Sequence, residues 1–217
     1  MITTLLFDFD GTLVDSEAVH FQCWDRVLAD YGIRYDQTTF CQRYAGRPTL
    51  ASAEDMVRRH QLQASAKALA SRKNTLFAEL AQSSLPPLMA HGQTTLQQAH
   101  QAGFTLALVT GSTRDEVEPI LQGYQLASLF SCIVCKDDVR NPKPHPEPYL
   151  QALAHLSVPA AQGVAIEDTS TGSRSAKDAG LTVAAIPNCH TLVQDFSHVD
   201  RRFDDLQQFY LWLLQQK

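Results

Sequence analysis

Two aspartates near the start of the chain, Asp8 and Asp10, have the residue type and spacing needed for acid and base chemistry. They follow the apolar run Ile2 to Phe7, and alternate residues of an extended chain point the same way. Two carboxylates that share one spot push one pKa up, so one can stay protonated as an acid while a cation keeps the other ionised. Taken alone, the pair also fits two surface acids at a strand end.

A second candidate group is Thr110-Gly111-Ser112, which follows the apolar run Thr105 to Val109. Thr113 and Glu116 then have the spacing of a capping box, which predicts that a helix begins there. A hydroxyl, a glycine that lets the backbone come close, and the free N–H groups of a helix end together make a cradle for phosphate. A plain helix cap explains Thr113 and Glu116 but not Thr110.

Lys143 stands between two prolines, which fix its backbone just before a helix whose first residue is expected to be Pro146. A cation held in this way can offset the repulsion between a phosphoryl group and an attacking carboxylate. A solvated loop lysine is the alternative. Glu167 and Asp168 close a further apolar run, and hard carboxylate oxygens suit Mg²⁺, which takes one or two carboxylates, waters and substrate phosphate.

The elements that must position these residues are short buried strands alternating with helices. Helical patterns over Thr94 to Ala102 and Ser173 to Ala179 end at glycines, as helices commonly do. This alternation predicts an α/β fold with a doubly wound parallel sheet, whose carboxyl edge gathers the four candidate groups. The predicted strands are Thr3 to Phe9, Thr105 to Val109, Ser131 to Cys135, Val164 to Ile166 and Thr182 to Ile186.

One part of the chain breaks this alternation. From about Asp15 to Leu85 apolar residues recur at helical spacing without a convincing strand, and the segment closes at Pro86-Pro87. We therefore expect a helical cap domain at residues 15–85, inserted after the first strand, and a core domain at residues 1–14 and 86–217. An insertion at this place should lie over the edge of the sheet.

Bulk composition limits the functions that remain. The chain has 217 residues, 44% hydrophobic composition and a net charge of -5 without a basic run, so nucleic acid is not an expected partner. No stretch approaches the ~20 apolar residues that span a bilayer. Five scattered cysteines do not form a disulfide framework, and Cys132 and Cys135 should face opposite sides of a strand. We expect a cytoplasmic protein, as a monomer or weak homodimer, with no membrane partner.

Together these residues resemble the haloacid dehalogenase superfamily. Asp8-Phe9-Asp10-Gly11-Thr12, Thr110, Lys143 and Glu167-Asp168 match its four motifs in order. The helical insertion is similar to the small cap of the subgroup that contains β-phosphoglucomutase and sugar-phosphate phosphatases. Three cap sequences strengthen this placement, namely Ser16-Glu17, His20 and Arg72-Lys73-Asn74.

The resemblance implies a role for each matched residue. Asp8 would attack phosphorus and form an aspartyl-phosphate, while Asp10 would protonate the leaving oxygen and then activate water. Thr110 and Lys143 would hold the phosphoryl oxygens. Mg²⁺ would be the cofactor, bound by Asp8, Asp168 and the Asp10 backbone carbonyl, with Glu167 helping through water. The residues expected to bind a small phosphorylated substrate are Gly11, Gly111, Ser112, His20, Arg47 and Lys73; Arg47 also fits a surface arginine, and His20 a histidine packed against Trp24.

Three functions remain open at this stage. The first is a phosphatase for a small phosphorylated metabolite, expected to be a sugar phosphate. The second is a β-phosphoglucomutase-type mutase, although Gly111 to Arg114 lack the lysine with which the mutase grips a second phosphate. The third is a non-catalytic binding module, against which the intact set of acids and Lys143 argues.

Overall fold

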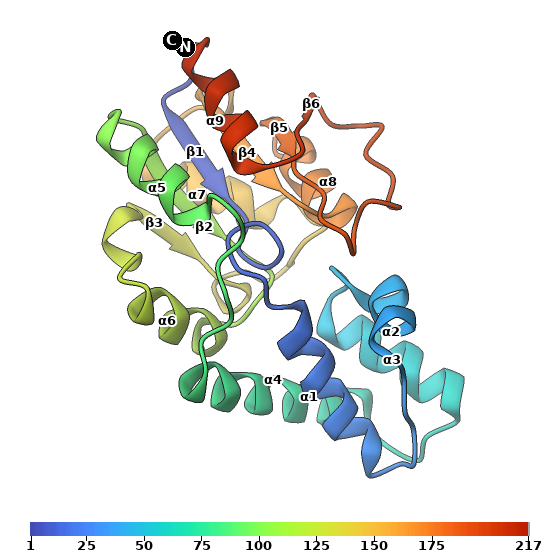
Figure 1. The fold of residues 1–217 in the computed structure, drawn as a ribbon. Helices are drawn as coiled ribbons and strands as arrows, with labels where there is room; N and C mark the ends of the chain where they lie inside the picture. Colours follow the sequence, from blue (N-terminus) through green and yellow to red (C-terminus); the bar gives the residue numbers. More distant parts are fainter. Residues whose placement is uncertain (217) are drawn as a thin grey trace.

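The computed structural model of the chain describes residues 1–216 and has a six-stranded parallel sheet at its centre (Figure 1). The strand order is β3-β2-β1-β4-β5-β6, so the chain winds outward from β1 in one direction and from β4 in the other. In such a sheet the crevice for ligands lies at the carboxyl ends of the strands, where the order reverses. The strands are β1 (Thr4–Phe7), β2 (Thr105–Val109), β3 (Cys132–Val134), β4 (Gly163–Glu167), β5 (Thr182–Ala185) and β6 (Arg201–Arg202).

Helices cover both faces of the sheet, as the alternation of strands and helices predicts. Helices α5 (Gly92–Gln101), α6 (Arg114–Gly123) and α9 (Leu206–Leu214) pack on one face, and α7 (Glu147–Leu156) and α8 (Ser170–Asp178) on the other. Phe7 belongs to the first apolar cluster and its neighbour Leu6 to the second, because successive side chains of a strand point to opposite faces. Both side chains are fully buried.

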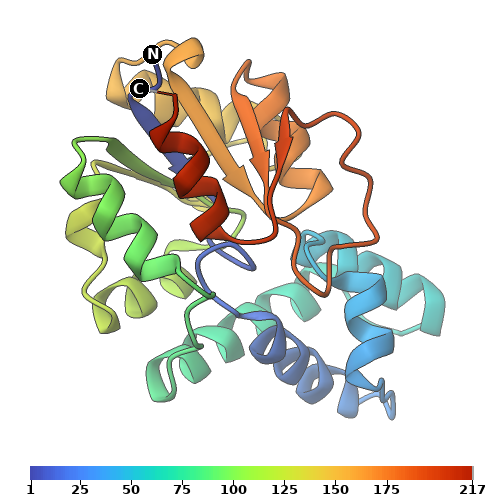
Figure 2. The same ribbon diagram turned by 45° about the horizontal axis from the view of Figure 1, so that its top comes forward.

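A group of four helices lies between β1 and α5 in the sequence and beyond the carboxyl edge of the sheet in space (Figure 2). We call it the cap segment: α1 (Glu17–Ala29), α2 (Gln37–Tyr44), α3 (Thr49–His60) and α4 (Ala66–Ser83). It has an apolar cluster of its own, built around Trp24, Phe40 and Met56. Helix α4 also packs against α6 of the core. The division into domains at residues 14–15 and 85–86 stays a prediction.

The observed bounds of β1, β4 and α7 differ by a few residues from those predicted from the sequence, at residues expected to be functional. Asp8 lies just past β1 instead of inside a strand, although its N–H still donates to Ile166 O at 2.9 Å. Glu167 is the last residue of β4, and α7 begins at Glu147, because Pro146 takes the N-cap position. Three short 3₁₀ turns complete the core: Ala127–Leu129, Lys136–Asp138 and Ala160–Gln162.

Two other sequence expectations can be compared with the fold. Cys132 packs with the cluster that contains Leu6 and Cys135 with the one that contains Phe7, so the two thiols face opposite sides of the sheet, as predicted. Both are free cysteines. Among the residues that the structure describes, we find no helix with the length and apolar character needed to cross a membrane.

Candidate active site

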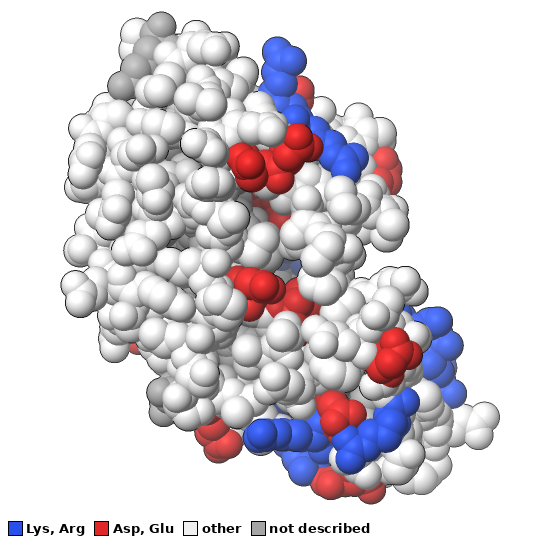
Figure 3. Space-filling model, viewed as in Figure 1, with Lys and Arg blue, Asp and Glu red and all other residues white. Residues whose placement is uncertain are grey.

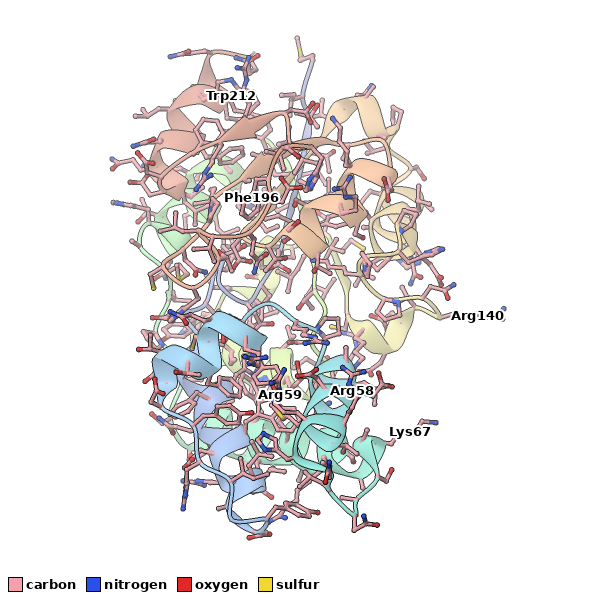
Figure 4. The ribbon with its side chains drawn as sticks, turned by 90° about the vertical axis from the view of Figure 1, so that its right-hand side faces the viewer. Arg58, Arg59, Lys67, Arg140, Phe196 and Trp212 are labelled. Carbon is pink, nitrogen blue, oxygen red and sulfur yellow. The ribbon has the colours of Figure 1, made fainter. Side chains whose placement is uncertain are left out.

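Lys143 stands at the centre of a buried group of charges at the carboxyl edge of the sheet. Its Nζ donates to Asp8 Oδ1 at 2.7 Å, to Glu167 Oε1 at 2.6 Å and to the Val109 carbonyl at 2.8 Å. An ammonium group has three N–H donors, and all three are used here. Arg140, three residues earlier, points away from the molecule (Figure 4). The loop therefore turns Lys143 inward and holds it in one place.

The charges of this group shift one another's pKa. Burial raises the pKa of Asp8 to about 7, and the Glu167 carboxylate adds to this rise, while Lys143 opposes it. Burial alone would lower the pKa of Lys143, but the carboxylates of Asp8 and Glu167 raise it above its ordinary value. The lysine is therefore a permanent cation next to a carboxylate whose charge depends on its surroundings.

Glu167 is fixed by its partners and does not face open space. Its Oε1 accepts hydrogen bonds from Lys143 and, at 2.8 Å, from the Tyr149 hydroxyl, and its Oε2 accepts one from Thr169 Oγ1 at 3.2 Å. A Cβ atom at Gly172 would lie 2.0 Å from the same carboxylate, so only glycine fits there. Glu167 therefore positions Lys143, while its expected contact with metal through water stays a prediction.

Asp168 has the properties of a cation ligand. Asp8, Glu167 and Asp168 each offer a carboxylate oxygen within 4.8 Å of the others. Asp168 Oδ1 is buried and has no hydrogen-bond partner among the described residues, and burial together with Asp8 and Glu167 raises the pKa of Asp168 well above its ordinary value. A cation relieves all of these costs, and the donors are oxygens only. The residues present therefore fit Mg²⁺.

Asp10 has a different environment from Asp8. It accepts hydrogen bonds from Ser16 Oγ at 2.5 Å and Ser112 Oγ at 2.6 Å, and its Oδ1 lies 3.4 Å from His20 Nε2. Burial would raise the pKa of Asp10, but these three groups lower it below its usual range. The order of the two pKa values is thus the reverse of the expected one: the expected nucleophile, Asp8, has the raised pKa.

The residues after β2 form the expected turn into a helix. The buried Thr110 hydroxyl accepts a hydrogen bond from Ser112 N at 3.0 Å, and the Thr113 N–H donates to Glu116 Oε2 at 2.9 Å, so the predicted cap is present. Helix α6 begins at Arg114. A Cβ atom added at Gly111 would meet nothing within 4 Å, which leaves open space beside its backbone.

Gly11 shows how closely the ends of β1 and β4 approach each other. Its φ of +77° lies in the region that favours glycine, and an added Cβ would lie 2.3 Å from Asp168 Oδ2 and 2.7 Å from Asn188 Nδ2. A larger residue would therefore displace Asp168. The structural need for glycine comes from this contact, and the expected role of Gly11 in substrate binding stays a prediction.

The cap segment brings three expected substrate-binding residues to the site. His20 stacks on Phe77 with ring centroids 4.4 Å apart and reaches Asp10. Lys73 is 1% exposed, and its Nζ donates to Glu116 Oε1 at 3.0 Å, so its charge is already paired with the core. Arg47 is exposed and has no side-chain hydrogen bond among the described residues. Their roles toward a substrate stay predictions.

One cavity lies between the cap segment and the edge of the sheet, with a volume of about 130 Å³, and Thr110 and Gly11 are not among the described residues that line it. Figure 3 shows a hollow between the two parts of the molecule with acidic side chains beside it, whereas basic side chains gather toward the outer end of the cap segment. Core residues that line the cavity include Asp8, Asp10, Gly111, Ser112, Lys136, Lys143 and Asp168. Cap residues that line it include His20, Trp24, Phe40, Tyr44, Arg47 and Lys73.

Comparison with known proteins agrees with this arrangement. The family model described as haloacid dehalogenase-like hydrolase matches residues 5–186. The chain belongs to this family. As a haloacid dehalogenase-like hydrolase it is an enzyme, and residues 5–186 contain the cap segment and every site residue named so far except Asn188.

Individual relatives of this hydrolase cover almost its whole length. Protein CbbY of Rhodobacter capsulatus is 30% identical over 94% of this chain and 94% of its own, and fructose-1-phosphate phosphatase YqaB of Escherichia coli is 29% identical over 82% and 92%. A crystal structure of a CbbY mutant from Rhodobacter sphaeroides, in complex with xylulose-(1,5)bisphosphate, has a TM-score of 0.79 and 28% identity over 95% of each chain.

Sequence reasoning missed several residues of this haloacid dehalogenase-like site. Tyr149 supports Glu167 from the first turn of α7, Glu116 pairs with Lys73, and Asn188 donates to Asp168 Oδ2 at 2.9 Å. Glu116 carried a signal, because its capping-box spacing placed it next to the Thr110 turn. No sequence pattern pointed to Tyr149 or Asn188, since only the packing of α7 and of the loop after β5 brings them near the site.

Proposed function

We propose that this protein is a magnesium-dependent phosphatase that forms an aspartyl-phosphate on Asp8. The observation that carries the proposal is the contact of Lys143 Nζ with Asp8 Oδ1 in a cavity that also contains Asp10 and Asp168. A carboxylate that attacks an anionic phosphoryl group needs positive charge beside it, and Lys143 supplies that charge. Hydrolysis of a phosphate monoester needs up to ~10²¹-fold acceleration, so several stabilising groups are expected in one place.

Mg²⁺ would be held by Asp8, Asp168 and the backbone carbonyl of Asp10. When bound, it neutralises charge on the phosphoryl oxygens and on the acidic cluster. The partnerless Oδ1 of Asp168 supports this assignment.

The protein's own groups account for the two half-reactions. Asp8 attacks phosphorus, the bond from phosphorus to the leaving oxygen breaks, and Asp10 gives that oxygen a proton. Water then attacks the aspartyl-phosphate, Asp10 takes a proton from the water, and the bond between Asp8 and phosphorus breaks. Thr110 and Lys143 hold the phosphoryl oxygens through both steps, Lys143 with the N–H that it donates to Asp8 before the substrate binds. A phosphoryl dianion next to Asp10 raises its pKa, which favours the protonated form needed in the first step.

We infer that the leaving group is a small sugar or a related polyol. Two relatives support this inference, one named as a fructose-1-phosphate phosphatase and one seen with a xylulose bisphosphate. The cavity suits such a group, because Ser52, Thr49 and His20 offer hydrogen bonds on the cap side, while Trp24 and Phe40 offer apolar surface for C–H faces.

A phosphoglucomutase is the second candidate, and two ion pairs of one arginine disfavour it. Arg114, the cation that follows the Thr110 turn, is held by Asp138 at 2.7 Å and Glu118 at 3.4 Å. An arginine paired in this way is not free to grip the second phosphate of a bisphosphorylated sugar. Water is therefore the proposed acceptor.

A panel of sugar phosphates tests the proposal, with released phosphate as the readout. We expect turnover that depends on Mg²⁺, stops in excess chelator and falls on the order of 10⁴-fold in Asp8→Asn. Activity that persists in chelator would contradict the metal role. Isomerisation of glucose 1-phosphate with a bisphosphate primer, without free phosphate, would favour the mutase, and no turnover of any phosphate ester would favour a binding module.

A further inference from the structure

The loop after β5 lies next to the proposed metal ligand Asp168. Ile186 N–H donates to Glu167 O at 2.7 Å, so the chain stays paired with the end of β4 one residue beyond β5. Two residues later, the Asn188 Nδ2 group donates to Asp168 Oδ2 at 2.9 Å and to the Gly11 carbonyl at 3.2 Å. One amide therefore connects the ends of β4 and β1 at the edge of the cavity.

The Asn188 amide can take only one orientation. Its Oδ1 accepts from the His190 N–H at 2.9 Å, and a backbone N–H can only donate. Its Nδ2 faces a carbonyl and a carboxylate, which only accept when the carboxylate is ionised. The turn is closed by further bonds, because Asn188 N–H donates to Thr191 Oγ1 and Thr191 N–H donates to Asn188 O, both at 3.0 Å.

This fixed amide distinguishes the two oxygens of Asp168. Oδ2 has the Asn188 donor, whereas Oδ1 is buried and has no hydrogen-bond partner among the described residues. The Asp168 carboxylate as a whole belongs to the acidic group with Asp8 and Glu167. A carboxylate that is tied at one oxygen cannot rotate freely about its terminal bond, so the direction of the other oxygen is fixed as well.

We propose that Asn188 is a positioning residue for the metal: it holds Asp168 Oδ2 so that Oδ1 is presented to Mg²⁺. The inference rests on the proposed function, because it requires a metal at Asp168. Groups that orient metal ligands in this way typically change metal affinity 10- to 100-fold when they are removed.

Mn²⁺ binding to the full chain tests this role without using activity. Mn²⁺ prefers the same oxygen ligands as Mg²⁺, and the free ion can be counted by electron paramagnetic resonance. Asn188→Ser keeps an oxygen for the His190 N–H but is too short to reach Asp168, and we expect its Kd for Mn²⁺ to rise about tenfold or more. Thr191→Val is the matched control, since it removes the Oγ1 hydrogen bond of the same turn without touching the amide, and its Kd should stay unchanged.

A second readout separates positioning from general damage. Saturating Mg²⁺ should restore the kcat of Asn188→Ser, while the Mg²⁺ concentration for half activity rises with the Kd. If Asn188→Ser does not fold, Asn188→Gln moves the amide by one methylene group and should weaken Mn²⁺ binding in the same direction.

Three results would overturn the inference. If Asp168→Asn weakens Mn²⁺ binding and Asn188→Ser does not, Asn188 only shapes the loop, and the proposed function stands. If Thr191→Val weakens binding as much as Asn188→Ser, the integrity of the turn is responsible. If Asp168→Asn itself binds Mn²⁺ like the unmodified protein, the metal assignment fails and the inference fails with it.

Discussion

The cavity has two walls that differ in how their charged groups are held. On the core side Lys143 is buried and has three hydrogen-bond partners, and Asp10 has two hydroxyl donors and a histidine. On the cap side Arg47 reaches the same cavity from an exposed position. Groups that stabilise the charge developing on the phosphoryl group are more effective when they are fixed before the substrate binds, because they then need no reorganisation during the reaction. Groups that recognise a leaving group can stay adaptable.

Lys73 does not fit this division, since it comes from the cap but is as buried as the core residues. Its ion pair with Glu116 joins α4 to α6, and Glu116 also accepts from the Thr113 N–H that starts α6. The cap is therefore tied to the turn that carries Thr110. Four substitutions test whether the groups of the core wall are fixed and those of the cap wall adaptable.

Asp8→Asn should have the largest effect on activity. We expect phosphate release to fall on the order of 10⁴-fold, because removal of a nucleophile leaves only binding and charge stabilisation. Thermal unfolding without metal should occur at a temperature at least as high as in the unmodified protein, since the lost charge is buried beside Glu167. Asp15→Asn, an exposed neighbour, is the control and should keep full activity. Comparable losses in both variants would contradict the assignment of Asp8.

Lys143→Met should reduce both activity and stability. Two buried carboxylates lose their shared cation, which costs about 3–5 kcal/mol of unfolding free energy when one partner of a buried pair is removed. Loss of the stabilising cation should also lower kcat about 10²- to 10³-fold. Urea unfolding and phosphate release measure the two effects. Lys177→Met breaks an exposed pair with Asp200 and should change neither by much, so equal effects in the two variants would refute the central place of Lys143.

Glu116→Gln tests the connection between the cap and the core. Burial would raise the pKa of Glu116, but Lys73 lowers it below its ordinary value of 4.5, so the ionised pair stabilises the fold above that pH. As pH falls from 4.5 toward the lowered pKa, this contribution disappears. We expect the variant to be about 3 kcal/mol less stable at pH 7 and the difference to shrink in acid, as measured by urea unfolding at several pH values. Glu118→Gln, exposed on the same helix, should show no such pH dependence.

Arg47→Ala should have the smallest effect. If Arg47 contacts only the leaving group, as proposed, it contributes binding and not catalysis. KM should then rise about tenfold or less, while kcat stays close to that of the unmodified protein. Steady-state kinetics on the best sugar phosphate measures both constants, and Arg43→Ala on α2 serves as an exposed control. A large drop in kcat with unchanged KM would place Arg47 with the groups that act on phosphorus.

The local sequence predicted the parts of the site that follow from position along a strand or a helix end. Asp8, Thr110 and Asp168 each end or follow a buried apolar run, and parallel strands bring such ends to one edge. The cap of α6 followed from the spacing of Thr113 and Glu116. The sequence could not give the order of the pKa values of Asp8 and Asp10, because that order depends on burial and on hydroxyl donors such as Ser112, which lies 102 residues from Asp10 in the chain.

What the sequence determined by itself was therefore the kind of fold, the position of its carboxyl edge and the residue types that meet there, since hydrophobic periodicity and helix caps are local properties. The tertiary structure alone decided the partners. Lys143 meets Glu167, Lys73 meets Glu116, and Asn188 meets Asp168 across separations of 24, 43 and 20 residues. A side chain's charge and the direction it faces depend on such distant neighbours, because burial and hydrogen bonding are set by packing and not by adjacency in the chain.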